Sequence, residues 1–234
     1  MTIAIGINLG SYAILAADTR TTYHRFGMPF YDDNSTKVQK TTMGLITGAG
    51  FLPLLDSVKR KLATEQITST ERVLIIIKEE RERILQAWRI HSQIDSWIEQ
   101  TGWIFSYTAL LNNEPALRVG IFHPSINKEM YATYEVGSPE IIFPVELDPE
   151  TAKAIYDPIL QRIKVPTDSS KLQSSIEQNS TAIGAVISAL QPHCPSISRR
   201  LQVGIHSGGQ VGISDLIDIQ GDGTFSLNIK LDNL

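Results

Sequence analysis

The second residue of the chain, Thr2, has a side chain suited to nucleophilic chemistry. Methionine aminopeptidases remove an initiator methionine before small residues, so loss of Met1 would leave Thr2 with a hydroxyl and a free α-amine. The amine can then accept the hydroxyl proton while the oxygen attacks a carbonyl. An α-amine titrates near pH ~8, so a useful fraction is unprotonated at neutral pH. Thr2 is therefore a candidate nucleophile, although many unrelated chains also begin Met-Thr.

Five short motifs after Thr2 carry polar residues or glycines. They are Ala17-Asp18-Thr19-Arg20, Lys37-Val38-Gln39-Lys40, Ile46-Thr47-Gly48, Val136-Gly137-Ser138 and Ser207-Gly208-Gly209. Each has an ordinary structural interpretation when it is taken singly. An Asp and a Lys at neighbouring strand ends commonly form a surface ion pair worth ~0–1 kcal/mol, and glycines mark turns. The order and spacing of the five motifs make the set more informative than its members.

Together with the start Thr2-Ile3-Ala4-Ile5-Gly6, these motifs resemble those of proteasome β subunits, which are N-terminal-nucleophile (Ntn) hydrolases. From Thr2 to Arg20 the spacing matches without gaps, and the expected order of strands and helices agrees over nearly the whole chain. The resemblance implies hydrolysis of peptide bonds through an acyl-enzyme on Thr2. A threonine directly after Met1 is similar to the start of the simpler bacterial proteasome-like peptidases.

The resemblance also implies roles for the residues that surround Thr2. Lys37 would place a positive charge near Thr2 Oγ and favour the alkoxide as it forms. Asp18 would pair with Lys37 and offset the cost of its burial, and Arg20 would brace this pair. The Gly48 N–H would donate to the oxyanion, an interaction usually worth ~3 kcal/mol in acyl-transfer sites.

Two serines complete the implied site, and one position departs from the pattern. Ser138 and Ser207 would hydrogen-bond around the Thr2 amine and fix its orientation. The family has an aspartate three residues before the Ser-Gly-Gly turn, where this chain has Gly204. His206 is expected to replace part of the missing carboxylate's role. The departure predicts slow hydrolysis and calls the activity itself into question.

By position in the resemblance, the primary specificity pocket would be lined by Thr21, Ser35, Ile46 and Gly50, with Ile46 near its base. None of these residues is charged, so we expect the pocket to accept an uncharged substrate side chain of small to medium size. The expected substrate is a peptide or an unfolded protein. The reaction needs no metal and no cofactor.

The elements that must position these residues follow from hydrophobic periodicity and turn signals. Gly10-Ser11 predicts a tight hairpin, and a polar connection containing Pro29 follows it. Further strands are expected at 37–41, 44–47, 103–111, 117–123, 130–135, 201–205, 211–219 and 225–231, and helices from Phe51, at 69–98, at 149–163 and at 169–190. This order favours an α+β four-layer α/β/β/α sandwich, formed as a single domain from residues 1–234.

Composition limits the partners that we expect. The chain has 234 residues and a net charge of −4, so charge gives no reason to expect binding to nucleic acid or an anionic membrane. The single cysteine, Cys194, excludes an internal disulfide and a cysteine-built metal cluster. The N-terminus lacks a basic stretch followed by an apolar one, and no apolar run approaches a membrane span. These features predict a soluble cytoplasmic protein.

Three functional hypotheses remain open on the sequence. The first is a self-compartmentalising homo-oligomeric peptidase. Ile75-Ile76-Ile77 cannot all face one core, which favours the oligomer. The second is a catalytically silent structural subunit of the same fold. The third is a non-peptidase amidase or peptide-modifying acyltransferase that uses the same nucleophile. The C-terminus shows no motif for docking to an ATPase unfoldase, so such a partner is left open.

Overall fold

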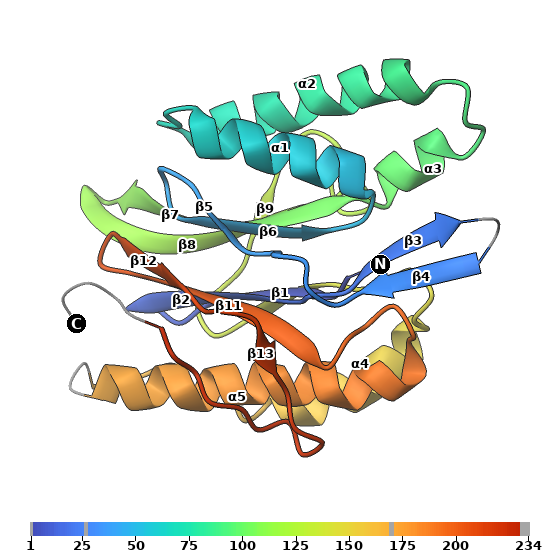
Figure 1. Cartoon of the computed structure of the whole chain (residues 1–234). Helices are drawn as coiled ribbons and strands as arrows, with labels where there is room; N and C mark the ends of the chain where they lie inside the picture. Colours follow the sequence, from blue (N-terminus) through green and yellow to red (C-terminus); the bar gives the residue numbers. More distant parts are fainter. Residues whose placement is uncertain (1, 26–27, 169–170, 230–234) are drawn as a thin grey trace.

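The computed structural model describes residues 2–25, 28–168 and 171–229, which form a mixed α+β protein with two stacked sheets (Figure 1). The first sheet has, in spatial order, β10 (Pro139–Ile142), β1 (Ala4–Asn8), β2 (Tyr12–Asp18), β11 (Arg200–Ser207) and β12 (Gln210–Ile213), with β13 (Ile217–Asp218) also paired to β11. The second has β5 (Gln39–Lys40), β6 (Leu45–Ala49), β7 (Gly102–Leu111), β8 (Glu114–Phe122) and β9 (Ala132–Thr133). The prediction of an α+β protein is confirmed.

Helices lie over the outer face of each sheet (Figure 1). The second sheet is covered by α1 (Leu52–Thr64), α2 (Thr70–Trp88) and α3 (Ile94–Glu99), and the first by α4 (Pro149–Leu160) and α5 (Leu172–Leu190). Side-chain caps fix two helix starts: Ser69 accepts from Arg72 N, and Asp148 accepts from Thr151 N at 2.8 Å. None of the helices in the described ranges has the length and apolar content needed to cross a membrane.

The hairpin of β1 and β2 positions the start of the chain. Leu9 N donates to Tyr12 O at 2.8 Å across the predicted turn, and Gly10 has φ +82°, which glycine adopts without steric cost. The resulting register pairs Ala4 with Ala17. Two residues further toward the N-terminus, this register brings Thr2 level with Thr19.

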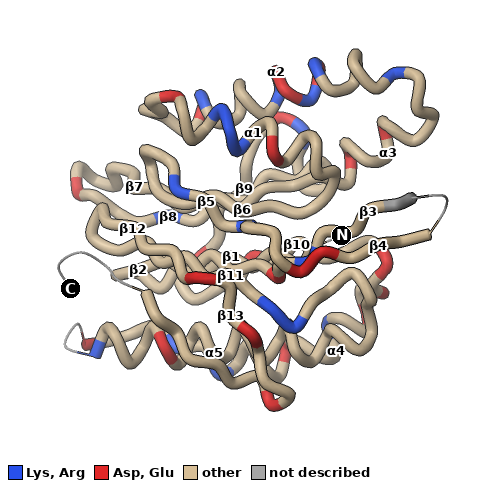
Figure 2. The backbone as a smooth tube through the Cα atoms, in the orientation of Figure 1, with Lys and Arg blue, Asp and Glu red and all other residues tan. Residues whose placement is uncertain are grey.

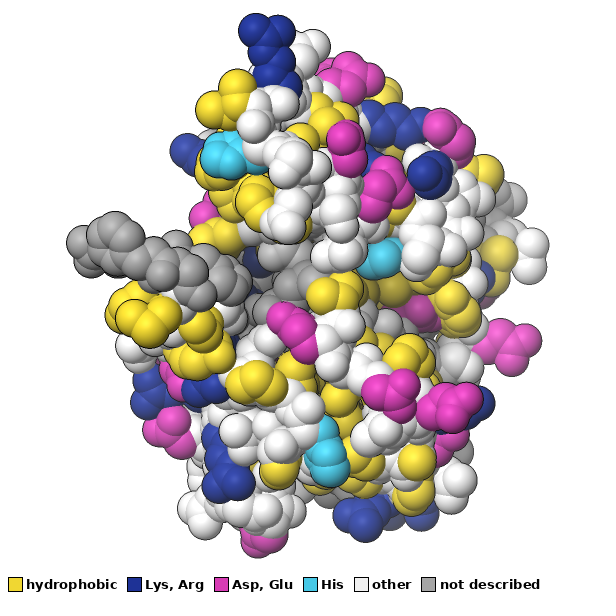
Figure 3. All heavy atoms as spheres, turned by 90° about the vertical axis from the view of Figure 1, so that its right-hand side faces the viewer, with side chains coloured by type: hydrophobic (Ala, Val, Ile, Leu, Met, Phe, Trp, Pro, Cys, Tyr) yellow, Lys and Arg dark blue, Asp and Glu magenta, His cyan; other side chains and the backbone are white. Residues whose placement is uncertain are grey.

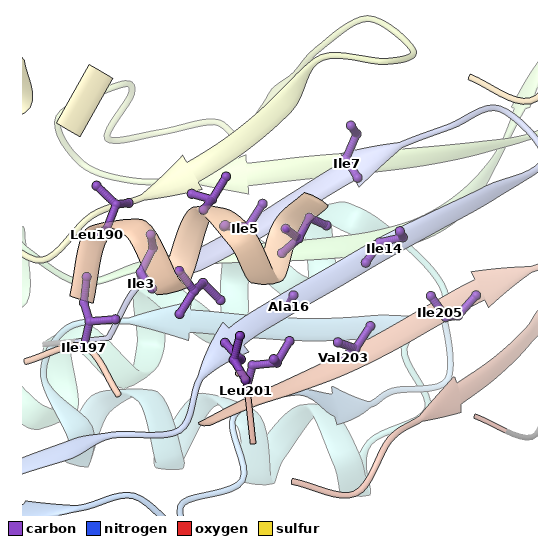
Figure 4. Packing of buried hydrophobic residues seen from close by; sticks show 14 of the residues in the cluster. Ile3, Ile5, Ile7, Ile14, Ala16, Leu190, Ile197, Leu201, Val203 and Ile205 are labelled. Atoms are coloured by element: carbon purple, nitrogen blue, oxygen red, sulfur yellow. The ribbon is translucent and has the colours of Figure 1, made fainter. Parts of the chain in front are cut away.

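Both faces of this hairpin are buried, but by different partners. Ile5, Ile7 and Ile14 point toward the layer of α4 and α5 and belong to a cluster that includes residues of α5 and β11 (Figure 4). The alternating residues are mostly alanine, with Leu15 as a larger one, and they face the second sheet. A Cβ at Gly6 would collide with the Ile104 side chain of β7, so glycine at this position allows the two sheets to approach closely.

The long helix predicted at 69–98 is instead two helices, because the chain turns between Trp88 and Ile94. This turn brings Trp97 of α3 into a stacked contact with Phe51, with the ring centroids 5.2 Å apart. Trp88 meets the same Phe51 ring edge-on, also at 5.2 Å. A continuous helix would carry Trp97 away from Phe51, so aromatic packing explains the break.

Several predicted strands are also corrected. The polar connection after Asp18 contains a ribbon of β3 (Thr21–Arg25) and β4 (Met28–Asp32), and β10 was not predicted. The strand expected at 211–219 is divided into β12 and β13, and only Ala132–Thr133 of the strand expected at 130–135 is extended in the sheet. Residues 225–229 form no strand, and residues 230–231 of that prediction lie outside the described residues.

The ribbon of β3 and β4 projects from the body of the protein and presents hydrophobic side chains to solvent (Figure 3). Tyr23 and Phe30 are directly opposite each other in the register, and both are about half exposed. Tyr31 lies under the Arg20 guanidinium, 4.7 Å from the ring centroid. The base of the ribbon is therefore joined to the end of β2.

Candidate active site

Thr2 lies two residues before the start of β1, at the end of the first sheet that is next to the ribbon, and only 5% of its surface is exposed. Its Oγ1 donates to the Arg20 carbonyl oxygen at 3.0 Å, and Asp18 N donates to Ile3 O at 3.2 Å. Side chains alternate along a strand, so Thr2 shares the face of Ala4, which is directed toward the second sheet. Met1 lies outside the described residues.

Asp18 ends β2, is fully buried and organises the surrounding backbone. Its Oδ1 accepts from Ile3 N at 2.8 Å, and its Oδ2 accepts from Arg20 N and Ser198 N, each at 3.0 Å. Burial raises the pKa of this carboxyl to about 6, while the three N–H donors and the charge of Lys37 act in the opposite direction. Asp18 is therefore ionised at neutral pH and holds three chain segments together.

Lys37 brings a buried positive charge to the same corner. Its Nζ donates to Thr21 Oγ1 at 2.7 Å, and Thr21 Oγ1 in turn donates to Ser35 Oγ at 2.7 Å. Burial lowers the pKa of Lys37, and the carboxylate of Asp18 opposes that shift. Within the described residues, Asp18 and Lys37 interact as separated charges and not as a contact ion pair.

Arg20 is oriented away from Lys37. Its guanidinium forms a two-point ion pair with Asp33, at 2.6 and 2.7 Å, and donates to Pro195 O at 2.7 Å. This guanidinium fixes the connection after β4 and the segment before β11. Arg20 contributes to the Thr2 corner through its backbone, whose N–H donates to Asp18 and whose carbonyl accepts from Thr2. Charged residues of β2, β4 and β11 gather around this corner (Figure 2).

Gly48 lies on β6, at a strand edge that faces the Lys37 segment. Continuing the register of Gln39 with Ile46 places Gly48 opposite Lys37. In the described pairings, β7 is the only strand paired with this part of β6. A Cβ at Gly48 would lie 2.6 Å from the Gly102 carbonyl oxygen, so close packing requires glycine here.

The four residues predicted to line a specificity pocket divide into two groups. Thr21 and Ser35 are hydrogen-bonded to each other beside Lys37. Gly50, with φ +129°, precedes α1 and packs against Thr101. Ile46 was expected near the pocket base. It is fully buried in the hydrophobic cluster between β6 and α1, on the face of the strand opposite to the one that faces the first sheet.

Ser138 and Ser207 do not lie beside Thr2. Ser138 precedes β10, whose Pro139 pairs with Ile7, so it lies near the far end of β1, about 20 Å along the strand from Thr2. Ser207 pairs with Tyr12, six residues along β11 from the position opposite Asp18, a separation of about 20 Å. Its hydroxyl donates to Ser11 O at 2.9 Å. The Ser-Gly-Gly motif is therefore the turn between β11 and β12.

The expectations for Gly204 and His206 change with this register. Gly204 faces the second sheet, where an added Cβ would lie 2.7 Å from Val38 Cγ1 and 2.8 Å from Leu45 Cδ1. His206 is buried, and its Nδ1 is 3.0 Å from Ser106 Oγ. Both residues belong to the packing between the sheets. Neither residue lies beside Thr2, and the slow hydrolysis expected from Gly204 stays a prediction.

Three residues that sequence reasoning missed contact the Thr2 corner. Ser198 precedes β11 and donates its backbone N–H to Asp18. Gln202 accepts from the backbone N–H groups of Lys37 and Val38, at 2.8 and 2.9 Å. Lys59 of α1 donates to the Lys37 carbonyl oxygen at 2.6 Å.

Two of the missed residues left a signal in the sequence. Gln202 interrupts the apolar run between Leu201 and Val203, and Lys59 occupies an apolar-face position of a helix, beside Val58 and four residues after Leu55. A polar side chain at such a position is buried when the element forms.

The fold defined by these elements is proteasome-like, as comparison with solved structures shows. No family model matches the sequence, and no curated protein matches it significantly. Structures of Anbu are among the similar solved structures. Anbu from Pseudomonas aeruginosa, described as a helical assembly, is 11% identical over 99% of this chain and 87% of its own, with a TM-score of 0.60.

Two further Anbu structures are similar to a comparable degree. A Gly-1 mutant of Anbu from Hyphomicrobium sp. strain MC1 is 13% identical, covers 99% of this chain and 88% of its own, and has a TM-score of 0.57. Anbu from Yersinia bercovieri, described as an ancestral beta-subunit, is 13% identical over 88% and 81% of the two chains, with a TM-score of 0.56. At these identities the likeness concerns the fold.

Proposed function

We propose that this chain is an N-terminal-threonine hydrolase that cleaves peptide amide bonds through an acyl-enzyme on Thr2 after removal of Met1. One observation carries the proposal. The Thr2 hydroxyl lies in a buried corner that also holds the Asp18 carboxylate and the Lys37 ammonium. We further propose that the sheets and helices form the four-layer α/β/β/α sandwich of Ntn hydrolases, as a single domain over residues 1–234.

In the first half of the proposed reaction, an ester bond to Thr2 Oγ forms, the scissile C–N bond breaks and one proton is transferred. Thr2 Oγ attacks the carbonyl carbon of the scissile amide, and the freed α-amine accepts the hydroxyl proton. The amine then gives this proton to the leaving nitrogen as the C–N bond breaks, which leaves an ester on Thr2. Water hydrolyses the ester by the same route and regenerates the hydroxyl.

The charges in the corner favour the first step. The Lys37 ammonium stabilises negative charge on Thr2 Oγ and lowers the pKa of the nearby amine, so that the amine is an effective base at neutral pH. Asp18 opposes the effect of burial on the pKa of Lys37 and so favours its protonated form. The backbone N–H of Gly48, on the edge of β6 opposite Lys37, is the proposed donor to the oxyanion.

The substrate is proposed to be a peptide or an unfolded protein bound in an extended conformation. The edge of β6 beyond the short β5 offers backbone groups to an added strand. Thr21, Ser35 and Gly50 border this edge and are uncharged, which favours an uncharged substrate side chain. Ile46 is fully buried against α1, so we leave it out of the proposed pocket.

A homo-oligomer in the cytoplasm is the proposed working form. Pseudomonas Anbu is described as a helical assembly, and we extend self-association to this chain. Ile75 on α2 is 46% exposed, which leaves apolar surface available for a neighbouring copy.

A catalytically silent subunit is the second candidate, and it is favoured by a specific observation. The Thr2 hydroxyl is hydrogen-bonded to the Arg20 carbonyl and Lys37 Nζ to Thr21, so the two are not joined directly. In the described residues, neither Ser138 nor Ser207 reaches Thr2. Reactivity then depends on whether the α-amine of Thr2 is free.

Intact mass and N-terminal sequencing, followed by labelling with a peptide epoxyketone, separate the two candidates. The hydrolase should begin at Thr2 and gain one equivalent of reagent, mapped to Thr2 by peptide mass spectrometry. Thr2→Ala should not be labelled, whereas Thr64→Ala, at an exposed threonine on α1, should be labelled at the wild-type rate. A chain that begins at Thr2 and remains unlabelled would establish the silent subunit.

A further inference from the structure

The backbone of Lys37 lies outside the hydrogen-bond ladder of its sheet. In the described pairings β5 contains only Gln39 and Lys40, so the peptide groups on either side of Lys37 have no partner strand. Lys37 is 5% exposed, so water does not readily replace the missing ladder. A buried backbone group without a partner is costly, and other groups must therefore satisfy this segment.

Two buried side chains supply those partners from opposite directions. Gln202 of β11, in the first sheet, places its Oε1 2.8 Å from Lys37 N and 2.9 Å from Val38 N. Lys59 of α1, on the far side of the second sheet, places its Nζ 2.6 Å from Lys37 O. The N–H and the C=O of Lys37 are thus held by different layers of the protein. Displacement toward either layer would break a hydrogen bond to the other.

Lys59 is a costly residue to place at this position. It is 7% exposed, and in the described residues no carboxylate lies within ion-pair distance of its Nζ. Burial and the charge of Lys37 lower the pKa of Lys59 to about 7, and only the more distant Asp56 acts in the opposite direction. A methionine would fill similar space without this cost. The contribution specific to Lys59 is the hydrogen bond to Lys37 O.

We infer that Gln202 and Lys59 are positioning residues that clamp the Lys37 peptide and thereby fix the place of its ammonium beside Thr2. This inference rests on the proposed function where it concerns rate. A small displacement of a charged group from the reacting atoms sharply reduces its effect. The clamp should therefore act on the rate of acylation at saturating substrate and leave substrate affinity unchanged.

The first test compares two neighbouring cations of α1. Lys59→Met removes the donor to Lys37 O, and Arg60→Met removes an exposed charge from the next residue. The inactivation rate by a peptide epoxyketone is measured over a range of reagent concentrations. We expect Lys59→Met to lower the limiting rate at least tenfold with half-saturation within twofold, and Arg60→Met to match the wild type. An unchanged limiting rate in folded Lys59→Met would overturn the clamp.

The second test addresses the other side of the clamp. Gln202→Met leaves the N–H groups of Lys37 and Val38 without an acceptor, whereas Gln202→Glu retains an acceptor of similar size. The limiting rate should fall at least tenfold in Gln202→Met and be largely restored in Gln202→Glu. Equal losses in the two variants would count against positioning. If Gln202→Met does not fold, the Lys59→Met comparison decides.

A third measurement is independent of activity. The pKa of Lys37 is followed by NMR of the ¹³C-labelled lysine ε-carbon, assigned with Lys37→Arg. Asp18, Asp32 and Asp56 are the carboxylates that act on Lys37 in the folded protein. Lys59 is not among the groups that act on this pKa, so removing its charge is not expected to alter it directly.

In Lys59→Met, release of the Lys37 peptide should let the ammonium reach water and raise its pKa toward the ordinary value, whereas Arg60→Met should not. If the wild type is not labelled at Thr2, the proposed function fails and this titration alone decides on the clamp. An identical Lys37 titration in all three proteins would then refute the clamp.

Discussion

Two buried carboxyl groups in the first sheet, Asp18 and Glu140, show how differently the chain treats the same chemistry. Asp18 accepts three backbone N–H groups, and its pKa rises only to about 6. Glu140 of β10 is 4% exposed, its Oε1 has no hydrogen-bond partner in the described part of the chain, and burial raises its pKa to about 8. Asp18 is built into a network, whereas Glu140 is enclosed by the packing.

The same contrast holds between the corner around Thr2 and the rest of the space between the sheets. In the corner, polar groups from β2, β3, β11 and α1 satisfy one another. Elsewhere the layer is filled by small and apolar residues such as Gly6 and Leu45, with His206 and Ser106 as a bonded pair. Buried polar groups with complete sets of partners therefore distinguish a site from ordinary packing.

The largest expected effect is a loss of stability when Gly204, which lies in the packed region between the sheets, is substituted. Gly204→Asp would place a Cβ 2.7 Å from Val38 Cγ1 and a carboxylate among apolar side chains. We expect a loss of about 3 kcal/mol or more in the free energy of unfolding. Urea denaturation measures it, with Gly221→Asp as the control because a Cβ there meets nothing within 4 Å. A stable and faster Gly204→Asp enzyme would restore the sequence-based view of this residue.

The next effect concerns Glu140. Its folded pKa is raised from 4.5 to about 8, so the folded state binds a proton more tightly than the unfolded state and stability falls as pH rises from about 4.5 to 8. Glu140→Gln removes this titration and should stabilise the protein by about 2 kcal/mol at pH 6 and by more toward pH 8, with the gain vanishing near pH 4. Thermal denaturation across this pH range measures the difference. A gain that does not depend on pH would show that Glu140 is not titrating in this way.

A smaller effect is expected in the rate when the charge of Asp18 is removed. Asp18→Asn leaves one oxygen for three N–H donors and withdraws the charge that opposes the lowered pKa of Lys37. The epoxyketone labelling rate at pH 7.5 should fall about tenfold, equivalent to about 1.4 kcal/mol. In the wild type the rate should also decline below pH about 6 as Asp18 is protonated. Asp18→Asn should lack that step, and its persistence would assign it to another group.

The smallest effect separates two serines of the β11 region. Ser198→Ala removes a hydroxyl that lies 3.4 Å from Asp18 Oδ2 and donates to Arg200 O at 2.8 Å, although its backbone N–H still reaches Asp18. We expect a two- to fivefold loss of labelling rate, about 0.4–1 kcal/mol. Ser207→Ala, at the other end of β11, should leave the rate unchanged. A larger loss of rate in Ser207→Ala than in Ser198→Ala would mean that the Ser-Gly-Gly motif lies at the site and that the site deduced from the strand register is wrong.

The sequence by itself determined the features that depend on neighbouring residues. A turn at Gly10-Ser11 determines which residues of β1 and β2 are paired. Thr2 must therefore lie beside Asp18 and Arg20 once the two strands form. The cap at Asp148 is likewise local, because its partner Thr151 is three residues away. These contacts need no information from the rest of the fold.

Tertiary structure decided which distant residues complete the corner. Ser198 meets Asp18 across 180 positions of the chain and Gln202 meets Lys37 across 165, and the register of β11 on β2 sets both contacts. The Ser-Gly-Gly motif falls at the other end of the same strand. A short motif fixes a turn through its own backbone, but its distance from a site depends on where its strand is paired. That pairing is selected by burial of Leu201, Val203 and Ile205 against α5, a property of the whole core.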